Sequence, residues 1–118
     1  MAKIVVTATH GTDDPNRATL AFLAAKAARE NGDEAVLFLM NEAVMLAREG
    51  VGKHVQGIGL APFQEVLEAV QALGVEMLVC KPCAEARGLS EDLLVEGARF
   101  AGMYDLTKLA AEGTVISF

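Results

Sequence analysis

Short apolar runs that alternate with helical segments are the feature of this sequence that most constrains its fold. Three such runs, Ile4–Thr7, Ala35–Met40 and Val75–Val79, contain no turn residues, and runs of this length are typical of strands buried on both faces. Between them, residues 17–31 and 63–73 repeat apolar side chains at the spacing of one helix face. A helix is the usual connection between two parallel strands. The pattern therefore predicts an α/β fold, with a mostly parallel sheet covered by helices on both faces as a three-layer sandwich.

Two weaker strand signals follow later in the chain. Arg99–Gly102 and Val115–Phe118 flank a predicted helix over residues 103–112. A length of 118 residues suits one hydrophobic core, and no linker or internal repeat divides the sequence. We therefore expect a single domain over residues 1–118.

Two turn-rich segments interrupt this pattern. Asp13 and Asp14 precede Pro15 and are predicted to cap the first helix. Residues 50–59 contain four glycines, but they lack the Gly-Lys-Ser/Thr ending of a phosphate-binding loop and follow no convincing strand. We expect this second segment to be a mobile cover over the site or an interface loop.

Charge and hydropathy argue against two classes of partner. The net charge is −6 and the ten Lys and Arg residues are scattered, whereas nucleic-acid binding needs a basic footprint. No apolar run approaches the length of about 20 residues that spans a bilayer. The apolar stretch at the N-terminus is too short for a signal peptide. We therefore expect a cytoplasmic protein that binds neither nucleic acid nor membrane.

The apolar content is high for so small a chain. Hydrophobic residues make up 53% of it, although small domains have much surface to cover with polar groups. Some of this surplus is expected to lie in subunit interfaces. The sequence therefore favours a homo-oligomer over a monomer.

The segment Cys80-Lys81-Pro82-Cys83 lies where a predicted strand gives way to a short alanine-rich helix. A cysteine at such a corner lies near unpaired backbone N–H groups and the positive end of the helix dipole, which predicts an exposed thiolate with a pKa below about 8.5. The Lys81 ammonium would add to this effect if it folded back toward the sulfur. Cys83, one turn into the helix, is expected to be the less exposed of the two.

Polar residues follow the first two strands as well. In parallel sheets, ligands gather at the carboxyl ends of the strands, and this edge should collect His10, Asn41 and Glu42 beside Cys80. His10 is a candidate to hydrogen-bond a ligand or the Cys80 thiolate, and Asn41 is a candidate to line a pocket. Together with Lys81 they form the predicted ligand-binding set.

Three stretches of the sequence carry a resemblance to a known family. They are the turn and alanine-rich helix that begin at Thr9-His10-Gly11-Thr12-Asp13-Asp14-Pro15-Asn16, the segment Leu78–Leu89 around the cysteines, and the close from Glu96 to Phe118. On these stretches the chain resembles the DsrE/DsrF-like family, which includes the TusD-type subunits of sulfur-relay complexes. The resemblance covers nearly the whole chain.

This resemblance implies a five-stranded α/β subunit that assembles as a homotrimer or homohexamer. It implies that Cys80 carries a sulfane sulfur as a persulfide, received from a donor protein and passed to an acceptor protein, without a cofactor. Cys83 is not matched in the TusD-type pattern and is interpreted as a resolving or tuning thiol. Whether such a sulfurtransferase-type carrier counts as an enzyme stays open, because a carrier that hands over its own sulfur does not turn over alone.

Other interpretations of the cysteines stay open beside this one. A dithiol redox protein would use Cys80 and Cys83 together, although no proline follows Cys83 and a thioredoxin-like fold needs a proline loop there. Zinc would need four ligands, and the only histidines, His10 and His54, are distant in sequence. A homo-oligomeric binding protein with a small ligand at the strand ends would need neither thiol.

Overall fold

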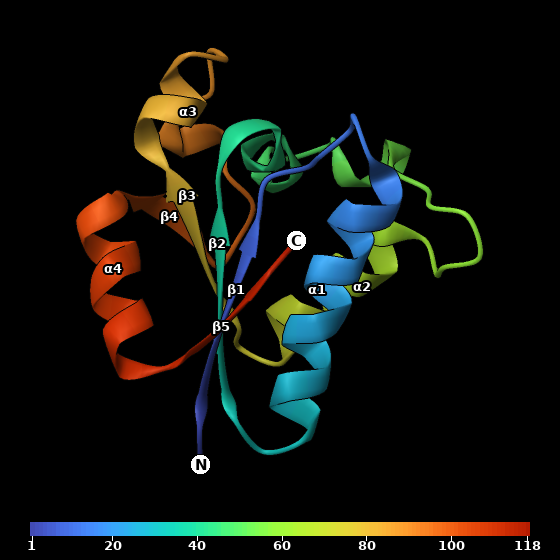
Figure 1. Cartoon of the computed structure of the whole chain (residues 1–118). Helices are drawn as coiled ribbons and strands as arrows, with labels where there is room; N and C mark the ends of the chain where they lie inside the picture. The colour runs from blue at the N-terminus through green and yellow to red at the C-terminus, as the bar shows by residue number, and fades with distance from the viewer.

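A computed structural model describes residues 1–118, and its five strands form one sheet (Figure 1). The sheet order is β4-β3-β2-β1-β5, and every neighbouring pair is parallel. The predicted α/β fold is confirmed, and the sheet is parallel throughout rather than mostly so. The strand bounds are β1 Lys3–Ala8, β2 Glu34–Leu39, β3 Glu76–Cys80, β4 Ala98–Ala101 and β5 Thr114–Ser117.

The helices match the predicted segments to within a few residues. Each of the first four strands is followed by helical structure, as the parallel connections require. None of these helices has the length and apolar character needed to cross a membrane. The α-helices are α1 Pro15–Glu30, α2 Phe63–Ala72, α3 Lys81–Glu85 and α4 Met103–Glu112, and the 3₁₀ helices are η1 Asn41–Ala47, η2 Gly52–His54 and η3 Glu91–Leu93.

The strand order determines which face of the sheet each helix covers. The steps from β1 to β2 and from β2 to β3 run in one direction across the sheet, and the step from β4 to β5 runs back. Because crossovers between parallel strands are right-handed, reversing the direction places the helix on the opposite face. Accordingly α1 and α2 lie together on one side and α4 lies alone on the other (Figure 1). These are the three predicted layers.

The two faces of the sheet are covered unequally. On the α1 and α2 face, Phe22 and Phe63 are fully buried and meet edge to face with ring centroids 4.7 Å apart. On the α4 face, no residue of α4 is buried. Val115 and Ile116 of the edge strand β5, whose side chains point to opposite faces of the sheet, stay 40% and 39% exposed. The core is therefore concentrated around β1, β2 and β3, and these three strands lead into the candidate site.

Candidate functional site

The carboxyl ends of three adjacent strands bring the cysteines, η1 and the His10 turn to one edge of the sheet. β3 ends at Cys80, β2 is followed by η1, and β1 is followed by the turn that contains His10. The ends are nearly level, because Ala8 pairs with Leu39 and Leu39 with Val79. Neighbouring strands lie about 4.8 Å apart, so the ends of β1 and β3 are separated by roughly 10 Å with η1 between them. The predicted edge is confirmed.

The two cysteines differ in exposure in the opposite sense to the prediction. Cys80 is only 4% exposed and belongs to the hydrophobic core, whereas Cys83 is partly exposed. Both are free thiols. Burial raises the pKa of the Cys80 thiol, the neighbouring Cys83 thiol raises it further, and the backbone N–H of Cys83 acts in the opposite direction. The predicted exposed, low-pKa thiolate at Cys80 is therefore wrong for this state of the molecule.

The physical reason lies in the size of the helix and in what covers the sulfur. α3 contains five residues, so its dipole is small and cannot offset the cost of placing a thiolate in an apolar environment. Pro82 fits the first turn of α3 because its missing N–H would be unpaired there in any case. Lys81 is exposed and makes no hydrogen bond or ion pair in the structure, so its side chain does not assist the thiol.

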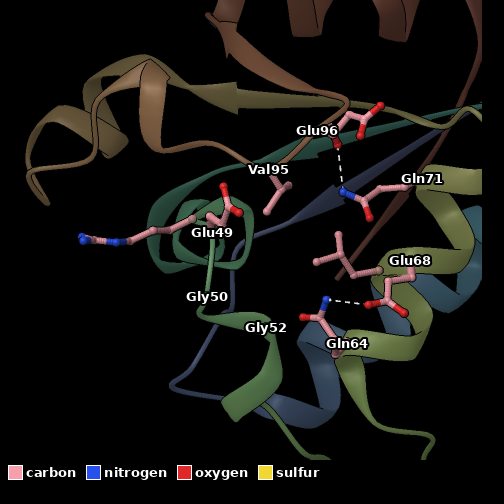
Figure 2. A pocket seen from close by; sticks show the side chains of 10 residues that line it. Glu49, Gly50, Gly52, Gln64, Glu68, Gln71, Val95 and Glu96 are labelled. Atoms are coloured by element: carbon pink, nitrogen blue, oxygen red, sulfur yellow. Dashed lines mark hydrogen bonds between the residues drawn. The ribbon is translucent and has the colours of Figure 1, made fainter.

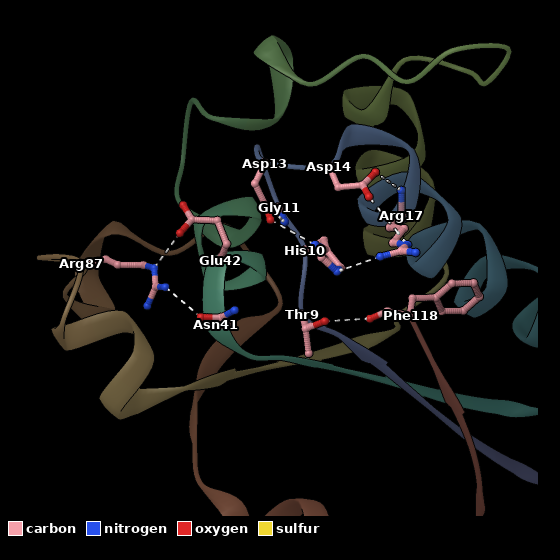
Figure 3. Close-up of polar contacts among 10 residues, drawn as sticks. All are labelled: Thr9, His10, Gly11, Asp13, Asp14, Arg17, Asn41, Glu42, Arg87 and Phe118. Carbon is pink, nitrogen blue, oxygen red and sulfur yellow. Dashed lines mark hydrogen bonds and ion pairs between the residues drawn. The ribbon is translucent and has the colours of Figure 1, made fainter.

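An arginine that the sequence did not single out connects the cysteine helix to the end of β2 (Figure 3). Arg87 donates from Nε to Glu42 Oε1 at 2.9 Å and from Nη2 to Asn41 Oδ1 at 3.0 Å. It also donates from Nη1 to the backbone oxygen of Cys83 at 3.0 Å. Asn41, predicted to line a pocket, thus binds Arg87 instead. The available sequence signal was an arginine four residues after Cys83, on the same side of the predicted helix.

The η1 turn that receives Arg87 has a constrained backbone. Asn41 has a φ of 53° and is the only residue other than glycine with a positive φ, a conformation that asparagine tolerates better than most residues. A Cβ placed on Gly11 would clash with the backbone oxygen of Glu42, so only glycine permits the approach of the β1–α1 turn to η1. The turns after β1 and β2 therefore pack backbone against backbone.

His10 is held within its own turn and does not contact Cys80 (Figure 3). Its Nε2 lies 3.3 Å from Arg17 Nη1, and its Nδ1 lies 3.0 Å from Asp13 Oδ2. Because a guanidinium only donates, Nε2 must be the acceptor and Nδ1–H donates to Asp13. Both ring nitrogens are thus occupied. The structure places His10 at the predicted edge but does not bring it onto the thiol.

The two aspartates of this turn have separate roles. Asp14 caps α1 by accepting from the backbone N–H of Arg17 at 3.1 Å, as predicted. Asp13 instead accepts from the backbone N–H of Gly11 at 2.8 Å. That hydrogen bond, together with the bond from His10, holds the pKa of the Asp13 carboxyl below its ordinary value although the residue is exposed.

The most prominent hollows of the molecule lie away from the cysteines. One of about 420 Å³ is bounded by α2 and by residues that precede η2 and β4 (Figure 2). This hollow is lined by three acidic side chains, Glu49, Glu68 and Glu96, and by one basic side chain, Arg48. A second, of about 470 Å³, opens where β3 and β4 begin. Neither contains Cys80, Asn41 or His10, and no group of three or more His, Cys, Asp or Glu side chains is arranged to hold a metal ion.

Comparison with known proteins identifies relatives across the whole chain. Residues 2–118 match the model of the DsrE/DsrF-like family. The uncharacterized protein MJ0989 of Methanocaldococcus jannaschii is 33% identical over 98% of this chain and 99% of its own length, and MK0008 of Methanopyrus kandleri is 35% identical over 86% and 81%. The crystal structure of the ychN protein from E. coli superposes with a TM-score of 0.83 at 28% identity and covers all of both chains. The structure of MTH1491 from Methanobacterium thermoautotrophicum has a TM-score of 0.79 at 15% identity over both full lengths and shares the fold.

Proposed function

Since the chain belongs to the DsrE/DsrF-like family, we propose that it is a small sulfur-relay protein that carries a sulfane sulfur on its cysteine pair. The observation that carries the proposal is the position of Cys80, at the carboxyl end of a central strand with a second thiol three residues later. Carboxyl ends of parallel strands are where α/β folds do their chemistry. We assign Cys80 as the sulfur acceptor and Cys83 as the resolving or tuning thiol.

The transfer is a pair of thiol–persulfide exchanges. The Cys80 thiolate attacks the outer sulfur of a donor persulfide, the S–S bond of the donor breaks, and the donor leaves as a thiolate. An acceptor thiolate then attacks the outer sulfur on Cys80, and the Cys80 thiolate leaves. No net oxidation occurs in either step. If Cys83 attacked the inner sulfur instead, a Cys80–Cys83 disulfide would form and hydrosulfide would leave.

This function needs partners and an assembly. We propose that the chain acts in the cytoplasm as a homotrimer or homohexamer, between a donor protein and an acceptor protein. The apolar residues left exposed on β5 and α4 support self-association. The net charge of −6 argues that neither nucleic acid nor an anionic membrane surface is a partner.

The first test is intact-mass spectrometry of the reduced protein after incubation with polysulfide. Wild type is expected to gain about 32 Da per sulfur atom. Cys80→Ser should gain nothing. Cys83→Ser should keep the adduct for longer, because no internal thiol remains to expel hydrosulfide. Reduction with dithiothreitol should reverse each adduct. An adduct confined to Cys83 would overturn the assignment of Cys80, and no adduct on the folded protein would overturn the relay function.

A dithiol redox function is the second candidate, because the Cys83 thiol lies near enough to Cys80 to raise the pKa of its thiol. In that case oxidised glutathione should convert wild type, but neither serine variant, to an intramolecular disulfide with a mass loss of about 2 Da. Rapid formation of this disulfide in a protein that takes up no sulfur would favour the redox function over the relay.

A further inference from the structure

A single guanidinium connects the cysteine helix to the end of the neighbouring strand. The three hydrogen bonds of Arg87 use three different nitrogens and reach two segments: the side chains of Asn41 and Glu42 in η1, and the backbone of Cys83 in α3 (Figure 3). The Arg87 and Glu42 side chains are 28% and 33% exposed. A charge-assisted contact that is partly shielded from water is stronger than an exposed surface pair.

The cysteine helix depends on such contacts for its position. α3 contains five residues, and a helix of that length is not stable without tertiary packing. It packs against η1 and the end of β3, and Cys80 is buried at this junction. Cys80 is the last residue of β3 and directly precedes α3, so a movement of α3 away from η1 changes the surroundings of the Cys80 sulfur.

The surface that receives Arg87 is fixed. Asn41 holds a positive φ, and Gly11 packs directly against the backbone oxygen of Glu42. Because η1 cannot shift toward the β1 turn without a clash, α3 is the element that is free to move when Arg87 is released.

We propose that Arg87 is the positioning residue of the cysteine pair: its contacts with Glu42, Asn41 and the Cys83 carbonyl hold α3 over Cys80, and their release opens Cys80 to thiol exchange. The purpose of this arrangement rests on the proposed sulfur-relay function. The effect of Arg87 on the exposure of Cys80 does not depend on that function, because it concerns only the accessibility of a thiol. A carrier built in this way keeps its sulfur covered between donor and acceptor.

The test measures the rate at which iodoacetamide alkylates Cys80, the only cysteine left in a Cys83→Ser background. The Cys80 thiolate displaces iodide, and intact mass follows the reaction. Arg87→Met should raise the rate roughly tenfold or more, because losing charge-assisted hydrogen bonds increases the population of the open state. Arg87→Lys, which keeps one of the three contacts, should fall between Arg87→Met and the parent. Glu42→Gln should raise the rate less than Arg87→Met.

Arg99→Met is the matched control. It removes an arginine whose side chain pairs with Glu76 of the neighbouring strand at 3.2 Å and makes no hydrogen bond or ion pair with α3. This variant should leave the alkylation rate unchanged. In a Cys80→Ser background, Arg87→Met should change the alkylation of the partly exposed Cys83 by less than twofold, whereas general unfolding would raise the rates at both cysteines.

An unchanged Cys80 rate in a folded Arg87→Met protein would overturn the proposal. If Arg87→Met failed to fold, an unchanged rate in both Arg87→Lys and Glu42→Gln would overturn it equally. Faster alkylation in a protein that never takes up sulfur from polysulfide would uphold the positioning role and reject the relay function. Sulfur uptake by a protein whose Cys80 alkylation rate does not change in Arg87→Met would uphold the relay function and reject the positioning role.

Discussion

At the scale of single residues, the site combines a covered thiol with a partly open one. Cys80 has a raised pKa because it is desolvated, and Cys83 lies beside it nearer the solvent. A buried neutral thiol is a poor nucleophile, so the resting molecule protects Cys80 from oxidants and from stray thiols. Reactivity then depends on an opening step as well as on deprotonation.

The raised pKa of Cys80 predicts a specific effect of alkali on stability. Because the folded state holds the thiol proton more tightly than the unfolded state does, the stabilisation is complete below the unfolded pKa and is lost as the pH rises through the folded pKa. Urea unfolding from about pH 7 to about pH 10 should show a loss of unfolding free energy that is smaller in Cys80→Ser. Parallel pH profiles for the two proteins would contradict the assigned burial.

The sequence predicted where Cys80 lies but not its surroundings. A strand followed by an alanine-rich helix is visible in a local window, and so is the corner between them. The contact that we propose to keep the sulfur covered joins Arg87 to Glu42, which is 45 residues away in sequence. Side-chain pairing over that distance leaves no periodic pattern, so neither the burial nor the role of Arg87 could be predicted.

At the scale of elements, the helices are defined by their apolar spacing and by their ends. α1 begins at an Asp14 cap followed by Pro15 and ends before Asn31 and Gly32. Those signals were readable in the sequence, as were the strands that alternate with the helices. The close approach of Gly11 to the backbone of Glu42 in η1 was not, because it joins two turns that are 31 residues apart in sequence.

The cap gives an element-scale prediction. Asp14→Ala should lower the free energy of unfolding by about 1 kcal/mol, because the backbone N–H of Arg17 loses its acceptor at the start of α1. Urea denaturation monitored by circular dichroism would measure the change. Glu30→Ala at the other end of α1, which loses only an exposed pair with Lys26, should stay within about 0.5 kcal/mol of wild type. Equal effects of the two substitutions would rule out the capping role.

At the scale of the whole molecule, the two edge strands of the sheet, β4 and β5, differ in how far they are protected from pairing with another chain. Along β4, the carboxylate of Glu91 accepts from the backbone N–H of Phe100 at 2.9 Å, which protects that edge from pairing with another chain. β5 pairs only with β1 and has no such cover. Its side chains are exposed on both faces, and Met103 and Tyr104 of α4 are 51% and 92% exposed.

This asymmetry predicts self-association through the α4 and β5 side. Sedimentation equilibrium of the 12.4 kDa chain should give a multiple of that mass, and Ile116→Lys should shift the equilibrium toward monomer because it places a charge among apolar residues. Ile58→Lys alters an exposed apolar residue on a distant loop and should leave the assembly unchanged. A monomeric wild type, or dissociation by Ile58→Lys alone, would exclude this surface.

The pairing of β5 with β1 also has an entropic consequence. β1 meets β2 after the connection that contains α1, but its other side meets a strand from the opposite end of the sequence. The Thr7 hydroxyl donates to Ser117 Oγ across a separation of 110 residues. The entropy lost in closing a loop grows with its length. β1 therefore pairs on one side with a strand 31 residues away (Lys3 with Glu34) and on the other with a strand 110 residues away (Ile4 with Thr114). The seam between β1 and β5 carries the largest loop-closure cost in the sheet.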